Sequence, residues 1–386
     1  MVVKQFFTID HMTLGKNQDD HIIEFEGLLN QPSQEAYDFA AGALHPHGIT
    51  PYFRISGNKH KVILKKGLSQ PQTPKNRVNL ILFLITFASI IFSGIITSYT
   101  GPKTLDFSII WAHVKVNLGQ SIAFAVSLLS ILTAHEFGHY FAARIHNTKV
   151  TLPFFIPFPI SPFGTMGAFI RLLEPPKNKR VLLDIGLAGP IGGLVIAIPV
   201  LVYGLNLSTI VNLPSVFPDD FMFEGNSILY LSLKYLVHGS LLPEPLSFQG
   251  IHPVIYWIRY FFTSLPLPYG GTDVSIHPVA WAGWAGLLIT SLNLLPAGQL
   301  DGGHLIYSLF GDKLKWVRPV ILGSLIILGF MWSGWWLWAF LILFLGQIRA
   351  EPLDEITELD PRRKLLARIG LIIFFLVFSP VPLIIV

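Results

Sequence analysis

The sequence predicts an all-α membrane protein with about six or seven transmembrane helices. It also predicts a small α+β domain at the N-terminus and a β-hairpin or re-entrant loop associated with the membrane. The mean hydropathy is +0.56, and 52% of the residues are hydrophobic against 13% charged, which lies outside the range of soluble globular proteins. Several apolar stretches are long enough to cross a bilayer, and short clusters of Lys and Arg separate them.

Composition also excludes several classes of function. The formal net charge is only +4, and the basic residues are spread over loops, so we expect a lipid bilayer and no nucleic acid as partner. The chain contains no cysteine, which excludes disulfides, thiolate metal sites and a cysteine nucleophile. The first 77 residues contain no long apolar run, so we expect no cleavable signal peptide.

The first predicted unit is a small soluble domain over residues 20–68. Apolar residues alternate in "HIIEFEGLL", follow helical spacing in "PSQEAYDFAAGALHPHG", and alternate again on both sides of Gly57 and Asn58. This order predicts a β-α-β-β domain. We expect residues 1–19 to be a tail and residues 69–77 to be a linker.

Residues 78–386 form the predicted membrane domain. One part, residues 317–348, is too long for a single straight crossing at ~1.5 Å of rise per residue. It predicts two helices joined by a turn at "WSGWW", residues 332–336. The other apolar spans, each long enough for one crossing, are 78–99, 121–145, 181–205, 278–310 and 366–386.

Basic clusters predict the orientation, because cytoplasmic loops are rich in Lys and Arg. The long segment 206–277 holds only Lys234 and Arg259, so we expect it to face outside. The N-terminus is therefore predicted to be cytoplasmic, in an integral, multi-pass protein of a prokaryotic plasma membrane. The clusters that predict cytoplasmic loops lie within residues 54–77, 144–180, 313–318 and 349–368.

An ionisable cluster interrupts the second apolar span, in "ILTAHEFGHYF". His135 and His139 are four residues apart, so they lie on one helical face and can both reach one zinc ion. Glu136 is well placed to accept a proton from a water at that metal. The alternative is a pair of core histidines bonded to neighbouring helices, but ionisable groups inside a membrane span are usually functional.

A later span supplies the best candidate for the third ligand that a catalytic zinc needs. Asp301 is an acid in a hydrophobic segment, and Gly302 and Gly303 beside it permit close helix approach. Counted from the basic ends of their spans, His135 lies ~14 Å and Asp301 ~18 Å of helix rise from the cytoplasmic side. The two residues therefore have similar depth. His304, three residues later, is a rival or additional ligand.

Asn293 and Pro296, just before this acid, are typical of a broken helix. An Asn side chain there has two possible roles. It can bind a substrate backbone or help to hold an oxyanion, or it can bond to the unwound backbone of its own chain. The sequence favours neither role over the other.

Together these segments resemble a known family. "HEFGH" and "NLLPAGQLDGG" resemble the paired signatures of site-2 proteases, which are intramembrane zinc metallopeptidases. "GTMGAFIRL" (164–172) and "LLDIGLAGPIGGLVIAIPVLVYGL" (182–205) resemble its bacterial branch related to plastid membrane metalloproteases. The resemblance implies regulated intramembrane proteolysis, with transmembrane proteins as substrates. It also implies a zinc ion held by His135, His139 and Asp301, with Glu136 as catalytic acid and base.

Two further segments have open interpretations. The proline-rich run 150–172 cannot form a regular helix. Its stretch 165–171 is either an edge strand that pairs with an extended substrate, involving Gly164, Thr165 and Gly167, or part of a re-entrant loop that plugs the bundle. The small residues of "GLAGPIGG" are most simply explained by tight helix packing.

Two other classes of function compete with a protease. In a metal-ion transporter, the same side chains would coordinate passing ions, although one compact site is not a chain of polar residues through the membrane. An inactive scaffold would bind membrane helices without cleaving them.

Overall fold

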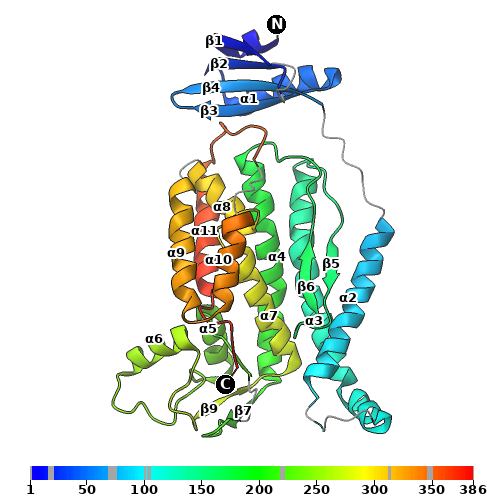
Figure 1. Ribbon diagram of the computed structural model, residues 1–386, viewed down its shortest axis with the longest axis vertical. Helices are drawn as coiled ribbons and strands as arrows, with labels where there is room; N and C mark the ends of the chain where they lie inside the picture. The colour runs from blue at the N-terminus through cyan, green and yellow to red at the C-terminus, as the bar shows by residue number, and fades with distance from the viewer. Residues whose placement is uncertain are drawn as a thin grey trace.

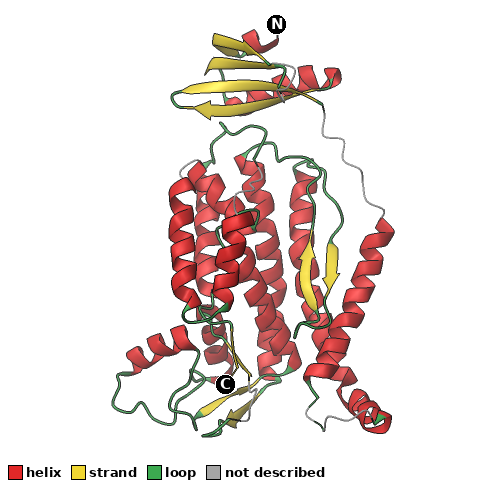
Figure 2. Cartoon of the chain, viewed as in Figure 1, coloured by secondary structure: helices red, strands yellow, loops and turns green. Residues whose placement is uncertain are grey.

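The computed structural model describes residues 2–15, 21–67, 76–99, 101, 106–217, 222–311, 314–345 and 351–385. Figure 1 shows three layers along the long axis: a small N-terminal domain, a bundle of helices, and a region of short helices and strands at the opposite end. Figure 2 shows that helix dominates the bundle, and the largest sheet lies in the N-terminal domain. Residues 69–75 of the predicted linker, Lys313 and Arg349 lie outside the described residues.

The N-terminal domain is an antiparallel sheet of order β1-β2-β4-β3. The side chains of Phe25, Tyr37, Phe53 and Val62 form much of the core between the sheet and its helix. The bounds are β1 (Phe7–Leu14), β2 (Ile23–Leu29), α1 (Ser33–Leu44), β3 (Ile49–Ser56) and β4 (Lys59–Lys66), with short 3-10 helices at Val2–Gln5 and His45–His47.

Strand β1 corrects one sequence prediction. A tail is predicted over residues 1–19, but Phe7–Leu14 pairs antiparallel with β2, and Phe7 lies opposite Leu29. The domain is therefore ββαββ rather than βαββ. Most side chains of this edge strand are exposed, so it lacks the alternating apolar pattern by which a strand is recognised.

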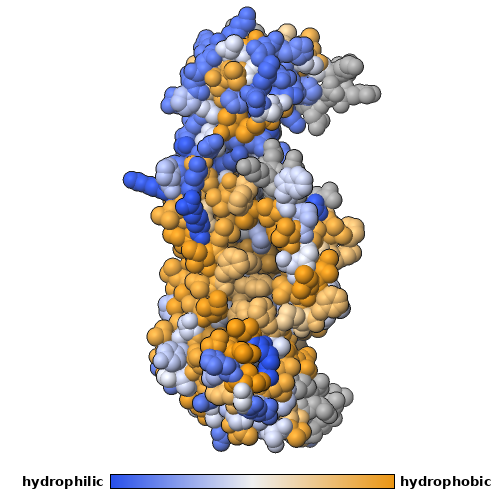
Figure 3. All heavy atoms as spheres, turned by 90° about the vertical axis from the view of Figure 1, so that its left-hand side faces the viewer, coloured by the Kyte–Doolittle hydropathy of each residue, from blue (hydrophilic) through white to orange (hydrophobic). Residues whose placement is uncertain are grey.

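The bundle is built on three long helices, α2 (Asn76–Thr97), α3 (Phe107–Ile145) and α4 (Lys179–Asn206). Among the described residues, these three are long and apolar enough to cross a membrane. In Figure 3 a broad apolar surface covers the bundle below the hydrophilic N-terminal domain. The shorter helices are α7 (Pro278–Asn293), α8 (Asp301–Phe310), α9 (Leu314–Gly329), α10 (Gly334–Leu345) and α11 (Pro361–Val377).

The structure changes three of the predicted spans. Helix α3 begins at Phe107, well before the predicted start at residue 121. The span 278–310 is broken into α7 and α8, and the last span ends as helix at Val377. A turn within 317–348 is confirmed, but it covers residues 330–333 rather than 332–336, because α10 already begins at Gly334.

Residues 206–277 form the layer farthest from the N-terminal domain (Figure 1). Lys234 is fully buried there, with its Nζ 3.8 Å from Glu224 and 3.6 Å from Asp273. Burial raises the pKa of the Glu224 carboxyl to about 7, against the opposing effect of Lys234. The strands β7 (Thr209–Asn212) and β9 (Thr272–Ser275) pair with each other, β8 (Met222–Glu224) pairs with β10 (Leu383–Ile385), and the helices are α5 (Ile228–His238) and α6 (Pro253–Thr263).

The proline-rich run forms a β-hairpin, the first of the two alternatives stated in the fold-class prediction. Strands β5 (Phe154–Pro157) and β6 (Thr165–Phe169) pair antiparallel. Polar side chains of α2 hold the hairpin: Asn79 donates to the carbonyl of Pro153 at 2.8 Å, and Ser89 donates to that of Gly164 at 2.6 Å. The bonds satisfy backbone groups in an apolar environment.

Residues 353–355 join the N-terminal domain to the bundle. The amide of Phe53 in β3 donates to the carbonyl of Leu353 at 2.9 Å, and that of Glu355 donates to Phe53 at 3.1 Å. On the other side, Leu353 and Asp354 donate to the carbonyls of residues 176 and 177, just before α4. This segment, which we call the junction strand, therefore extends the N-terminal sheet beyond β3.

We expect Asp354→Ala to loosen the junction strand. The fully buried Asp354 carboxylate accepts hydrogen bonds from Ser33 Oγ at 2.7 Å and from the amides of Ile356 and Thr357. Orphaning these donors costs about 3 kcal/mol. Hydrogen exchange at the Leu353 and Glu355 amides should therefore accelerate. The control Glu358→Ala removes a carboxylate that is 85% exposed, and unchanged exchange in Asp354→Ala would contradict this account.

Candidate functional site

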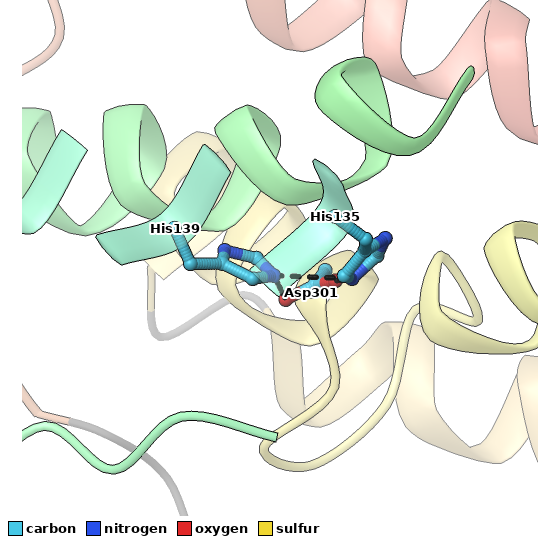
Figure 4. Close-up of side chains that lie close together, drawn as sticks. All are labelled: His135, His139 and Asp301. Atoms are coloured by element: carbon cyan, nitrogen blue, oxygen red, sulfur yellow. Dashed lines mark hydrogen bonds and ion pairs between the residues drawn. The ribbon is translucent and has the colours of Figure 1, made fainter. Parts of the chain in front are cut away.

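Three ionisable side chains converge inside the bundle, as Figure 4 shows. His135 and His139 project from one face of α3, and Asp301 reaches them from the first turn of α8. The Nε2 atoms of the two histidines are 3.2 Å apart. The Asp301 oxygens lie 3.3 Å from His135 Nε2 and 3.3 Å from His139 Nε2. Among the described residues, this is the group that could hold a metal ion.

The geometry of this triad fits zinc. A tetrahedral zinc with ligand bonds of about 2.0–2.1 Å holds its ligand atoms roughly 3.3 Å apart, which matches the three separations above. Two imidazoles and one carboxylate are also a donor set found in catalytic zinc sites. The Nδ1 atom of His139 donates to the carbonyl of Ile185 at 2.7 Å, so its Nε2 lone pair is directed at the metal position.

Helix α4 makes room for both imidazoles through glycines. A Cβ atom at Gly189 would lie 2.0 Å from His139 Nε2, and one at Gly193 would lie 3.2 Å from His135 Nδ1. A Cβ at Gly186 would lie 3.1 Å from the Cβ of His304. The sequence suggested only helix packing for this glycine-rich stretch. In the structure, its glycines also leave space for the candidate ligands.

The break between α7 and α8 presents Asp301. Helix α7 ends at Asn293, and residues 294–300 are irregular before α8 begins at Asp301. Gly302 allows this return to be tight, since a Cβ there would lie 2.0 Å from the carbonyl oxygen of Leu294. Gly298 has φ +59, a left-handed conformation that favours glycine. The tight return of the chain into α8, which presents Asp301, therefore requires glycine at positions 298 and 302.

Glu136 is buried beside the triad, with 4% of its surface exposed. Ile170, the residue after β6, lines the same cavity as Glu136. Glu136, the triad, Asn293 and His304 all line a cavity of about 210 Å³. Across this cavity lie Ala168, Phe169 and Ile170, from the end of the hairpin. The cavity thus places a carboxylate, the metal position and an extended backbone segment together.

The structure places the other predicted site residues differently. Asn293 Nδ2 lies 3.2 Å from His135 Nε2, so Asn293 joins the site. Gly164, Thr165 and Gly167 do not line the 210 Å³ cavity. Gly164 packs against α2, where a Cβ would lie 2.4 Å from Ile90 Cα. Thr165 Oγ1 donates to the carbonyl of Ile156 at 2.8 Å within the hairpin.

The sequence analysis missed Ile185 and Gln299 at this cavity, whereas the stretch 168–170 lies within the predicted edge strand 165–171. Ile185 acts through its backbone, which no side-chain pattern reveals. Gln299 lies within the quoted "NLLPAGQLDGG" segment, but an isolated glutamine carries no chemical signature. His304 lines the cavity without belonging to the triad.

A larger cavity of about 710 Å³ adjoins the site. Arg171, Glu174 and Glu351 line it, on the side of the bundle that faces the N-terminal domain. Five of its lining residues also line the site cavity, and two of these, Gln299 and His304, carry polar side chains. The candidate site therefore has a partly polar approach from that side.

Comparisons with known proteins give a consistent picture. The family description "Peptidase family M50" matches residues 123–322. The chain is 28% identical over 383 residues to "Probable zinc metalloprotease EGY1, chloroplastic" of Arabidopsis thaliana, covering 92% of the chain and 60% of that protein. It is 30% identical over 261 residues to "Probable zinc metalloprotease EGY2, chloroplastic" of the same plant, covering 65% of the chain and 40% of that protein.

The EGY1 protein of Oryza sativa subsp. japonica is 27% identical over 331 residues, covering 79% of the chain and 50% of that protein. The chain thus spans 60% or less of the length of these three relatives. No solved structure matches the chain. With its long apolar helices, the chain is an integral membrane protein.

We expect Gly189→Ala to abolish tight zinc binding, because the added methyl group would occupy the position of the His139 imidazole. Displacing a ligand in this way should weaken zinc affinity at least about tenfold, as the loss of supporting contacts already does. Metal analysis and chelator competition on the purified protein measure the effect. Gly323→Ala in α9 is the control, since nothing lies within 4 Å of its added Cβ. Equal affinities in both variants would refute this role for Gly189.

Proposed function

The chain belongs to peptidase family M50, and we propose that it is a zinc endopeptidase acting in regulated intramembrane proteolysis. It would hydrolyse peptide bonds within or near the transmembrane segments of membrane proteins. The observation that carries this proposal is the His135–His139–Asp301 triad, with Glu136 beside it, inside an apolar helical bundle. Ionisable groups are costly in such an environment and are usually functional.

The proposed roles follow from the contacts of each residue. His135, His139 and Asp301 hold the zinc ion, and Glu136 accepts and then donates the proton of the attacking water. When bound, zinc lowers the pKa of a water molecule and polarises a carbonyl group. The Ile185 carbonyl orients His139 through the 2.7 Å bond to its Nδ1. Asn293, 3.2 Å from His135 Nε2, lies where it can bond to a substrate carbonyl.

The hairpin supplies a template for the substrate. A helical substrate hides its peptide bonds, so it must be extended before hydrolysis. Strand β6 leads from Thr165 towards Ile170, which lines the site cavity together with Glu136. A substrate paired along β6 would be directed towards the general base. Gly164, Thr165 and Gly167 then shape the start of this template, while residues 168–170 face the reacting bond.

Water would reach the site through the 710 Å³ cavity. Gln299 and His304 lie at the boundary that this cavity shares with the 210 Å³ site cavity. Their polar side chains can bond to passing water in an otherwise apolar neck. The approach lies on the side of the N-terminal domain, which agrees with a path from the cytoplasm.

We further propose a multi-pass topology of six or seven spans with a cytoplasmic N-terminal domain, in a prokaryotic plasma membrane. Basic residues on the domain side of the bundle support this orientation. In this topology the shorter apolar helices α9 and α10 would account for two of the spans. The relatives' names place those proteins in chloroplasts. We carry over their enzyme class and not their compartment. The helix that opens the proposed membrane domain begins two residues earlier than the predicted boundary, because Asn76 and Arg77 belong to α2.

Glu136→Gln distinguishes this proposal from a transporter and from an inactive scaffold. We expect the variant to bind one zinc per chain and to lose at least about 100-fold in cleavage rate, the scale of general base catalysis. Asp301→Ala should lose both cleavage and the zinc ion. Cleavage of a membrane-spanning substrate by purified protein and metal analysis are the two measurements. Glu358→Gln, on an 85% exposed carboxylate, is the control. Wild-type cleavage by Glu136→Gln would rule out this chemistry.

The absence of cysteine makes the water path directly testable. Single cysteines at Arg171 and Glu174, which line the 710 Å³ cavity, should react with a membrane-impermeant thiol reagent from the cytoplasmic side. Val195, 62% exposed on the apolar α4, provides the lipid-facing control and should stay unlabelled. Labelling of the cavity positions from the outer side would reverse the proposed orientation.

A further inference from the structure

The short helix that carries Asp301 needs contacts to set its direction. Helix α8 has ten residues, and the irregular segment 294–300 prevents it from continuing α7. Asp301 is its first residue, so a tilt of α8 moves the carboxylate relative to the two imidazoles on α3. Ligand distances at a zinc site are held within about 0.2 Å. The contacts that fix α8 therefore affect zinc binding.

One of these contacts comes from the junction strand. Tyr307 lies on α8 six residues after Asp301, which is ~9 Å along the helix. Its hydroxyl donates to Glu355 Oε1 at 3.0 Å, and the ring is 5% exposed. The bond holds the end of α8 that is remote from Asp301, where restraint is most effective against tilting.

The N-terminal domain in turn holds Glu355. The amide of Glu355 donates to the carbonyl of Phe53, in β3. Arg54 Nη1 donates to the carbonyls of Pro352 at 3.0 Å and Leu353 at 3.2 Å. Leu353 and Ile356 pack on the hydrophobic core of the domain. Glu355 thus has its backbone on the N-terminal sheet and its carboxylate on the helix of the metal site.

We propose that the N-terminal domain is a positioning unit for Asp301. By taking residues 353–355 as an added strand, the domain fixes Glu355, Glu355 fixes Tyr307, and Tyr307 sets the tilt of α8. Arg54, Glu355 and Tyr307 are the positioning residues. This inference rests on the proposed zinc site and gives the N-terminal domain a role in the activity of the bundle.

The same arrangement links the domain to the entrance of the site. Glu351, next to the residues held by Arg54, lines the 710 Å³ cavity. Displacement of the junction strand from β3 would therefore loosen α8 and reshape the cavity together. If the domain were attached only for structural reasons, displacing the junction strand would change neither the position of Asp301 nor the shape of this cavity.

Zinc affinity of the purified full-length protein, measured by competition with a chromogenic chelator, tests the proposal. We expect Tyr307→Phe and Glu355→Ala each to weaken binding about threefold to tenfold, less than the tenfold or more for a direct partner of a ligand. The double variant should bind zinc no more weakly than Glu355→Ala alone, because Tyr307→Phe removes a bond that Glu355→Ala has already removed. Glu355→Gln keeps an oxygen acceptor for Tyr307 and should stay within about twofold of wild type.

The contact between the N-terminal domain and the junction strand is tested separately. Arg54→Ala should weaken zinc binding in the same direction, whereas Lys66→Ala, an exposed position at the end of β4 in the same sheet, should not. Tyr235→Phe, at a 52% exposed tyrosine on α5, is the matched control for Tyr307→Phe. Thermal unfolding of each variant identifies any that fails to fold.

Wild-type zinc affinity in folded Tyr307→Phe, Glu355→Ala and Arg54→Ala would overturn this inference and leave the proposed protease intact. A wild-type protein that binds no zinc would instead overturn the proposed function itself. The two failures are therefore distinguishable.

Discussion

The structure depends on one constraint: the charged and polar side chains inside its apolar bundle must each have a bonding partner. His135 and His139 are acceptable there because each has a specific neighbour. Asp301 lies 3.3 Å from both Nε2 atoms, and the Ile185 carbonyl accepts a hydrogen bond from His139 Nδ1. A buried charge without such partners would cost several kcal/mol. The folding of α3, α4 and α8 around one another is thus inseparable from the assembly of the site.

Helix α4 is the element that makes this possible. Gly189 and Gly193 let it approach α3 so closely that the imidazoles fill the space of missing side chains. Five residues before Gly189, Asp184 accepts hydrogen bonds from Arg363 at 2.6 Å and from His146 at 2.9 Å. These ion pairs join the ends of α3, α4 and α11 where the bundle meets the N-terminal domain. Helix α4 therefore packs closely on the two imidazoles, and the bonds of Asp184 fix it next to Ile185.

Two extended segments lie next to the candidate site. The β5–β6 hairpin reaches the site cavity through Ala168, Phe169 and Ile170, and the junction strand reaches α8 through Glu355. Both use backbone pairing, which specifies direction more strictly than apolar packing does. In a bundle whose helices contact one another mainly through small and apolar side chains, these segments give the candidate site contacts of fixed direction.

Sequence patterns by themselves determined the features that arise within one segment. The apolar spans, the break in 317–348 and the spacing of His135, Glu136 and His139 follow from helical periodicity. Depth in the membrane also pointed to Asp301 as the distant partner. Tertiary structure alone decided the strand β1, the room that Gly189 makes for His139, and the route from β3 to α8. Each of these joins residues far apart in the chain, through backbone bonds or the space left by a missing side chain, and neither leaves a periodic signal in the sequence.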